Sequence, residues 1–216
     1  MGDTALLPLI VATAAVALIP FVIITTTAFL KLSIVLFLLR NALGTQQTPP
    51  TLVLYAIAII LTAYVSAPLV SEIYARVAQP GADFATGEGL RMASTAVVEP
   101  IRAHLERFAM PEERDFLVSA ARQIWPPDFA QGVGTDNLLI LVPAYVSSEL
   151  TRAFQAGFLL YLPFIAVDLI VANILMAMGM AMVSPTVIST PLKVFLFVTV
   201  SGWTRLLHGL ILSYSS

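Results

Sequence analysis

Charged residues inside otherwise apolar stretches are the first candidates for chemistry in this sequence. Lys31 interrupts the run from Ala5 to Leu39, and Asp168 stands alone in "YLPFIAVDLIVANIL". Charged groups in such segments are costly and usually face a partner or a wet cavity. They predict either a proton or ion relay or ion pairs between helices or subunits. We favour ion pairs, because a relay usually shows several acids at different depths and here they are few.

A second pair of charges lies in the same apolar region as Asp168. Glu149 and Arg152 are three residues apart, so they lie on one helix face and can pair locally. Asp168 has no such neighbour, and we expect its cation to come from another helix or another chain.

The stretch "MAMGMAM" from Met176 to Met182 holds four of the seven methionines. Methionine is unbranched, apolar and adaptable, so a ring of these side chains can exclude water from a pore and deform around a passing chain. Gly179 and Pro185 would hold the segment out of regular helix, which is tolerated at membrane depth only beside protein or a cavity. The alternative is that the methionines fill an irregular core, and from the residues alone this is the more frequent explanation.

Signatures of enzymes are absent. The sequence has no H-E-x-x-H, G-x-S-x-G or P-loop motif and no cysteine, and its two histidines, His104 and His208, are far apart. We expect His104 to be solvated on a short polar helix. The prediction is a protein that is not an enzyme and has no cofactor or metal site.

The composition explains where such a chain can reside. It is 58% hydrophobic and 11% charged, with a mean hydropathy of +0.90, whereas soluble domains carry about 25% charged residues. The excess apolar surface predicts a membrane or a large assembly. A net charge of −2 argues against nucleic acid as a partner.

Four apolar regions predict the main helices: Ala5–Leu39, Leu52–Val70, Leu138–Met182 and Val194–Tyr214. The first is either one long helix or two pieces hinged near Pro20. The third is too long for one simple crossing of a bilayer core of about 30 Å.

The segment between the second and third regions is polar. Residues 75–137 hold six of the 11 Lys and Arg residues and nine of the 13 Asp and Glu residues. This predicts an N-terminal apolar part (1–74), a water-facing, mainly helical insertion (75–137) on the non-cytoplasmic side, and a C-terminal apolar hairpin (138–216).

Two short amphipathic helices are expected in the insertion, starting at Pro100 and Pro111. The apolar stripe of the second consists of Phe116, Leu117, Ala120 and Ile124, and "PPDFAQGVGTDN" after it reads as loop.

The polar turn "RNALGTQQTPP" joins the first two apolar regions. Gly44 can supply a left-handed helix end, and Asn41, Gln46 and Gln47 can bond free backbone groups. The prolines forbid continued helix, so the turn is predicted to be a stiff connector. Its residues are Arg40, Asn41, Gly44, Gln46, Gln47, Pro49 and Pro50.

The stretch "LLRNALGTQQTPPTLVLYAIAIILT" (38–62) resembles the signature of the FliP/SctR family of flagellar and virulence type III export proteins. The stretch from Leu138 to Trp203, which includes "SSELTRAFQAGFLLYLPFIAVDLIVANILMAMGMAMVSPTVISTPLKVF", resembles the same family. Without a long leader before the first apolar region, the sequence is more similar to the virulence branch.

The resemblance implies an all-α multi-pass protein of the bacterial inner membrane, within the basal body of the secretion system. It implies a homo-oligomeric ring of about five copies, joined by FliQ/SctS-like and FliR/SctT-like subunits and by a FlhB/SctU-like switch protein. The ring would contact membrane lipid and enclose a channel for unfolded secreted substrates. Neighbouring chains would then bury the over-long apolar helices and partner the charged residues Lys31, Glu149, Arg152, Asp168 and Lys193.

In that family the methionine-rich segment lines the narrowest part of the pore. The matching gasket residues here are Met178, Met180 and Met182, and the loop geometry depends on Gly179, Ala181 and Pro185. The resemblance implies three consecutive methionines after the glycine, and Ala181 replaces the middle one.

The sequence therefore predicts a non-enzymatic, pore-forming subunit of a type III export gate. Two alternatives remain: a secondary transporter that uses Asp168 and Lys31, and a membrane scaffold without a pore.

Overall fold

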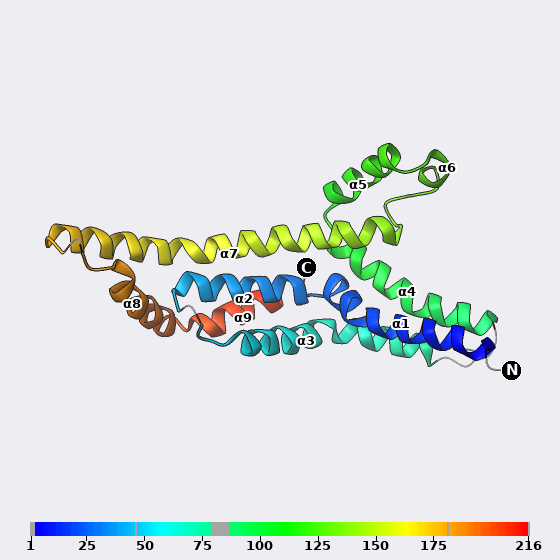
Figure 1. Cartoon of the computed structure of the whole chain (residues 1–216), viewed down its shortest axis with the longest axis horizontal. Coiled ribbons are helices and arrows are strands. Elements are labelled where there is room, and N and C mark those ends of the chain that lie inside the picture. The colour runs from blue at the N-terminus through cyan, green and yellow to red at the C-terminus, as the bar shows by residue number, and fades with distance from the viewer. Residues whose placement is uncertain (1–2, 46, 79–86, 181, 216) are drawn as a thin grey trace. The chain divides into compact units, whose positions relative to one another are not determined.

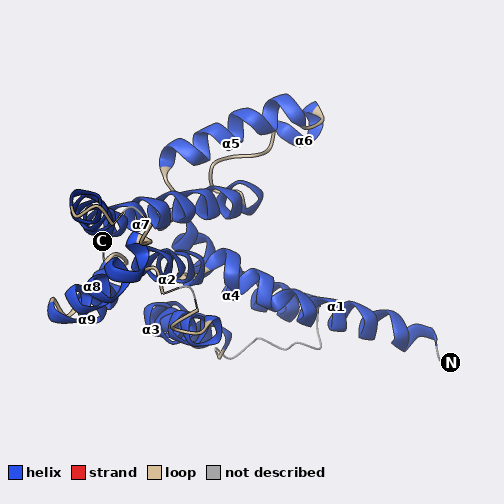
Figure 2. Cartoon of the chain, turned by 60° about the vertical axis from the view of Figure 1, so that its left-hand side comes forward, coloured by secondary structure: helices blue, strands red, loops and turns tan. Residues whose placement is uncertain are grey.

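The fold is known from a computed structural model that describes residues 3–45, 47–78, 87–180 and 182–215. These residues form helices and their connections and contain no strand, which confirms the all-α prediction (Figures 1 and 2). The helices are α1 (Asp3–Thr26), α2 (Phe29–Leu43), α3 (Thr51–Val77), α4 (Gly87–Phe108), α5 (Pro111–Ile124), α6 (Pro127–Ala130), α7 (Leu138–Ala177), α8 (Pro185–Thr199) and α9 (Gly202–Leu212).

The first apolar region is two helices, but the predicted hinge at Pro20 is wrong. Pro20 lies inside α1, and the break falls at Thr27 and Ala28. Three successive threonine hydroxyls, from Thr25 to Thr27, each donate to the carbonyl four residues earlier, at 2.6–2.8 Å. Such bonds bend helices. The Thr27 hydroxyl also accepts the N–H of Phe29 at 3.4 Å and so caps the start of α2.

Two of the helices are long and apolar enough to cross a membrane, α3 and α7, and there are up to four spans if each broken pair counts as one. The third apolar region forms α7, a single helix of 40 residues that includes Pro143 and Pro163. At 1.5 Å per residue it is about 60 Å long, roughly twice the thickness of a bilayer core. These helices indicate a membrane protein.

The fourth apolar region is broken in two at Val200 and Ser201. Ser201 has a φ of 54°, a left-handed conformation that no helix interior contains, and α8 and α9 are bent by 64° at this point. A Cβ atom at Gly202 would come within 2.3 Å of the Phe197 ring, so only glycine allows this close bend.

By its internal contacts the chain divides into two compact units. The first consists of Met1–Leu30 and Ser66–Glu149, and the second of Lys31–Val65 and Leu150–Ser216. The three sequence regions 1–74, 75–137 and 138–216 stay a prediction.

The second unit has a core formed by α2, α7 and α8. Leu39, Ala42, Leu43, Phe164 and Phe197 are buried together, and side chains of α9 pack against them. Helices α2 and α7 approach closely at Gly157, where a Cβ atom would lie 2.2 Å from the Leu38 side chain.

The first unit contains the polar insertion, and here the predicted stripe of α5 is only partly right, since Leu117 packs against the buried cluster. Val118 and Ala121 form its buried face, against Val133 and Ile140. Phe116 and Ile124, which the sequence assigns to the buried stripe, are exposed. The segment expected to be loop after α5 also contains the short helix α6.

The predicted start of a helix at Pro100 is also wrong, because α4 already begins at Gly87 and includes this proline. Pro100 removes one backbone hydrogen bond from the helix, but its ring is fully buried, which offsets part of that loss.

His104 differs from its predicted solvation. Its ring lies 4.9 Å from that of Phe108 and 5.9 Å from that of Tyr145, and Nε2 is buried without a hydrogen-bond partner. Burial lowers the pKa of the imidazole below its usual range, and the nearby Glu149 carboxylate opposes this change only in part.

Candidate functional site: the methionine-rich turn and its support

The methionine-rich segment ends α7 with a Schellman turn. Gly179 has a φ of 73°; its N–H donates to the carbonyl of Met176 at 3.0 Å, and the N–H of Met180 donates to that of Leu175 at 2.9 Å. This pair of bonds satisfies carbonyls that a helix end leaves free. A Cβ atom at position 179 would meet no atom within 4 Å, so the backbone conformation alone requires glycine here.

The methionine side chains of this turn are open to the surroundings. Met178 is 66% exposed, Met180 41% and Met182 100%. Within one chain these thioethers therefore do not fill a core. Ala181 lies outside the described residues.

Helix α8 begins directly after the turn. Ser184 has the extended backbone of an N-cap residue, and Pro185 occupies the first helical turn, where its missing N–H costs nothing. The N–H of Val183 donates to the carbonyl of Met180 at 3.1 Å. Gly179 thus ends α7, and Pro185 begins α8.

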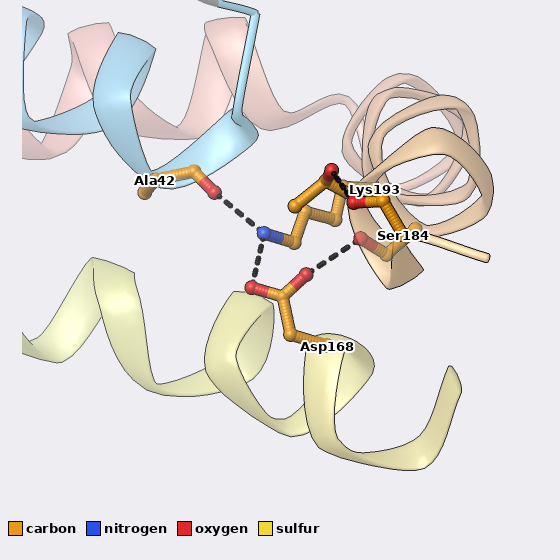
Figure 3. A network of polar contacts seen from close by, with 6 residues as sticks. Ala42, Asp168, Ser184 and Lys193 are labelled. Carbon is orange, nitrogen blue, oxygen red and sulfur yellow. Dashed lines mark hydrogen bonds and ion pairs between the residues drawn. The ribbon is translucent and has the colours of Figure 1, made fainter. Parts of the chain in front are cut away.

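An ion pair joins α7 to α8 behind the turn (Figure 3). Lys193 Nζ lies 2.6 Å from Asp168 Oδ2, and the Ser189 hydroxyl donates to Asp168 Oδ1 at 2.7 Å. Lys193 and Ser189 are buried, while the side chain of Asp168 is 40% exposed. The cation that the sequence could not assign to Asp168 thus comes from another helix of the same chain.

Lys193 also contacts the end of α2. Its ammonium donates to the carbonyl of Ala42 at 3.1 Å, in the last turn of that helix (Figure 3). A cation is favourable at this position because the last carbonyls of a helix are free and carry partial negative charge. One lysine therefore holds together α2, α7 and α8.

The connector turn after α2 packs on α8. Gly44 has a φ of 73°, the left-handed conformation that the sequence predicts for it. A Cβ atom at Gly44 would lie 2.9 Å from the hydroxyl of Thr190 on α8, so here the neighbour as well as the backbone requires glycine.

Side chains within the connector turn close it by hydrogen bonds. Arg40 Nη1 donates to the hydroxyl of Thr51 at 3.0 Å and to the carbonyl of Pro49 at 3.4 Å. The hydroxyl of Thr45 donates to the carbonyls of Arg40 and Thr48.

The hydrogen bonds predicted for the side-chain amides of this turn stay a prediction, and the structure gives the bonds of its backbone. Asn41 accepts through its backbone carbonyl, Gln47 donates through its backbone N–H, and Gln46 lies outside the described residues. The sequence did not single out Thr45 and Thr51, although threonine is a common hydrogen-bonding residue of turns.

The other charged residues predicted to form ion pairs are Lys31, Glu149 and Arg152. Lys31 is 3% exposed, and its ammonium lies 3.6 Å from the centre of the Tyr214 ring, a cation–π contact that the sequence did not indicate. Glu149 is fully buried, and Arg152 follows it by one turn on α7.

Among the described residues no three His, Asp or Glu side chains come together in a way that could hold a metal ion. The site combines exposed apolar side chains, which offer no directional bonds, with a partly buried ion pair behind them.

Comparison with known proteins gives consistent matches along the whole chain. A profile of the FliP family matches residues 12–210. A probable translocation protein of Sinorhizobium fredii is 52% identical over 211 residues, which cover 98% of this chain and 95% of that protein. The Yop proteins translocation protein R of Yersinia pestis is 44% identical over 206 residues and 95% of each chain. The harpin secretion protein HrcR of Erwinia amylovora is 44% identical over 200 residues, 93% of this chain and 92% of that protein.

Proposed function

The chain belongs to the FliP family, on its virulence (SctR) branch, and we propose that it forms the protein-conducting pore of a type III export gate. A role in the type III export apparatus follows from the family and from relatives named for translocation and secretion. The pore and its methionine seal are our proposal beyond that role.

The observation that supports the pore is the exposed methionine-rich turn. In a ring of about five copies, Met178, Met180 and Met182 would converge on the axis from every subunit and form a gasket. Their thioether side chains are unbranched and apolar, so they exclude water when packed together and adapt to any passing sequence. A cluster of exposed methionines is costly in a lone chain, which favours an arrangement in which other copies cover them.

The geometry around the turn suits a seal that opens repeatedly. The Schellman glycine and Pro185 fix where the turn begins and ends, while Lys193 and Asp168 hold α8 against α7 behind it. A substrate could then displace the methionine side chains without moving the helices that carry them.

In the proposed assembly the ring lies in the inner membrane and binds FliQ/SctS-like, FliR/SctT-like and FlhB/SctU-like subunits. Unfolded proteins are the substrates. The energy comes from elsewhere, because this sequence has no nucleotide-binding motif.

The transporter alternative finds less support. A proton or ion carrier needs a carboxylate that can exchange its partners, whereas both oxygens of Asp168 bond within the chain, to Lys193 and Ser189. Asp168→Asn should therefore impair assembly of the complex. Loss of transport by a normally assembled Asp168→Asn complex would favour the transporter.

The gasket is tested by ion leak. The triple variant Met178→Ala, Met180→Ala, Met182→Ala should make membranes that carry the assembled complex leaky to ions, and Ala181→Met should reduce any basal leak. Met92→Ala is the matched control, because Met92 is an exposed methionine on α4. Normal ion tightness together with normal secretion in the triple variant would contradict the proposal.

A further inference from the structure

Arg205 is a charged residue in the middle of an apolar segment. It is the only Lys, Arg, Asp or Glu between Val194 and Tyr214, and it lies on α9, the last described helix (Figure 1). Its side chain is exposed and forms no ion pair or hydrogen bond with any described residue. Such a charge is costly in a membrane or in an apolar interface unless a partner of opposite sign reaches it.

The other cations of the second unit already have partners within the chain. Lys193 pairs with Asp168, and Lys31 lies over a tyrosine ring. Arg40 donates to the connector turn, and Arg152 has an interaction partner in the chain as well. Among the described Lys and Arg residues of this unit, only the arginine of α9 therefore indicates a missing anion.

The apolar regions of this chain have no carboxylate to spare. Residues 31–65 and 150–216 contain a single acid, Asp168, and its two oxygens are bonded to Ser189 and Lys193. Glu149, the other acid within the four apolar regions, is fully buried and also has an interaction partner in the chain. A second copy of this chain therefore offers no free carboxylate in an apolar segment.

A groove of about 630 Å³ lies beside this arginine, within the usual size range of binding sites. Arg205 is part of its lining, and so is Gly209, one turn further along α9, where a Cβ atom would meet no atom within 4 Å. An occupant must therefore present apolar side chains and one negative charge. The rest of the lining comes mainly from apolar side chains of α2, α7, α8 and α9, which include Val35, Leu159, Leu160, Phe164 and Leu206.

We propose that this groove binds an apolar helix of a different subunit, which places one Asp or Glu side chain against Arg205. A helix suits an apolar site because its backbone hydrogen bonds are all satisfied internally. Arginine binds a carboxylate through two parallel hydrogen bonds, so the pair would fix the register of the partner helix as well as attract it. The inference rests on the proposed assembly with other subunits, but not on the pore or its methionine seal.

A zero-length cross-link tests the contact directly. The assembled complex with Arg205→Lys is treated in membranes with dicyclohexylcarbodiimide, an apolar reagent that activates carboxylates. The activated carboxylate reacts with the introduced amine to form an amide, and the carbodiimide leaves as a urea that carries the oxygen and both hydrogens of the water lost. We expect peptide mass spectrometry to find this amide on an Asp or Glu in an apolar segment of a different subunit.

Two controls define the background. Thr204→Lys places an amine at an exposed position of the same helix that does not line the groove, and it should give no such product. Lys193 Nζ and Asp168 Oδ2 are 2.6 Å apart, so the reagent should join them within the chain in every variant and thereby report its own access.

Variants of α9 test the location and the charge. Gly209→Leu should fill the groove and abolish the cross-link, whereas Gly209→Ala adds only a Cβ atom in open space and should retain it. Arg205→Gln should weaken co-purification of the cross-linked subunit about tenfold or more, because it leaves a carboxylate in the interface without its partner.

Three results would overturn the proposal. A cross-link to an acid of a second copy would show that the groove joins identical chains. No cross-link from position 205, while the amide between Lys193 and Asp168 forms, would show that water or a lipid phosphate solvates the arginine. Equal cross-linking from position 204, or an unchanged yield in Gly209→Leu, would place the partner outside the groove. None of these readouts measures ion leak, so the test of the methionine seal is independent of them.

Discussion

The connector turn and the methionine-rich turn use the same backbone device in opposite surroundings. Each ends a helix with a glycine whose φ is 73°. Gly44 is crowded by Thr190, and its turn is closed by side-chain hydrogen bonds, whereas Gly179 has open space around it and exposed methionines beside it. The first is a rigid joint, and the second is a defined backbone that carries adaptable side chains. Both glycines have the same φ, so the residues around each glycine decide whether its turn is rigid or carries adaptable side chains.

Lys193 links the two helices that end in these turns, α2 and α7, and its removal should have the largest effect. Lys193→Ala leaves the Asp168 carboxylate and the Ala42 carbonyl without their shared donor. Breaking a buried pair costs ~3–5 kcal/mol. We expect a loss near the lower end, about 3 kcal/mol, because Asp168 is partly exposed. Chemical unfolding of the purified chain in detergent measures it.

The control is the double variant Lys193→Met, Asp168→Leu, which removes both charges at similar volume. It should lose less stability than Lys193→Ala alone, since no unpaired carboxylate remains. An equal or larger loss in the double variant would contradict a role as an ion pair.

The two glycines should respond differently to the same substitution. A left-handed conformation costs a residue with a Cβ atom roughly 1–2 kcal/mol, so Gly179→Ala should lose about 1 kcal/mol. Gly44→Ala should lose about 2 kcal/mol or more, because its Cβ atom also meets the Thr190 hydroxyl at 2.9 Å.

Thr190→Ala sharpens this comparison. It removes the crowding hydroxyl, so the loss caused by Gly44→Ala in that background should approach the loss caused by Gly179→Ala. If the two glycines lose equal stability in the wild-type background, the distinction between a crowded and an open turn is wrong.

Acid should lower the free energy of unfolding of the chain without changing the difference in stability loss between Gly44→Ala and Gly179→Ala. The folded protein lowers the pKa of His104, so below about pH 6.5 the unfolded state binds more protons and the free energy of unfolding falls. His104→Gln should remove this contribution. Because His104 belongs to the other unit, the difference between Gly44→Ala and Gly179→Ala should be the same at pH 5.5 and pH 8.

The smallest expected change is in the stability of methionine variants. Met180→Ala with Met182→Ala should alter the free energy of unfolding of the lone chain by about 0.5 kcal/mol or less, as exposed positions usually do. A loss of 2 kcal/mol or more would show that these side chains pack inside the chain, as the core-filling alternative holds.

The sequence predicted the features that depend on local chemistry. Hydropathy located the apolar helices, and proline located the start of α5. Gly44 indicated a left-handed helix end, and Gly179 indicated an interruption of regular helix. These outcomes follow from backbone preferences that a few neighbouring residues determine.

Features that depend on distant neighbours were missed. The break at Thr27 is an exception, because it depends on local threonine hydroxyls that the sequence offered and not on Pro20. Phe116 was assigned to the buried face of α5 because periodicity gives a stripe but not which of two adjacent stripes meets the core. The partners of Lys193 were invisible because Ala42 contributes only its backbone carbonyl, although Ser189, four residues before Lys193, offered a signal on the same helix face.

Cross-linking to a stalled substrate tests the pore most directly, since the chain has no cysteine of its own. Met182→Cys and Met92→Cys would be placed in the assembled complex while a secreted substrate with a single cysteine is stalled in the channel. A methionine gasket predicts disulfide cross-linking at position 182 and none at position 92, only while the substrate is stalled. Cross-linking at neither position, or equally at both, would contradict the assignment of the methionine-rich turn to the pore.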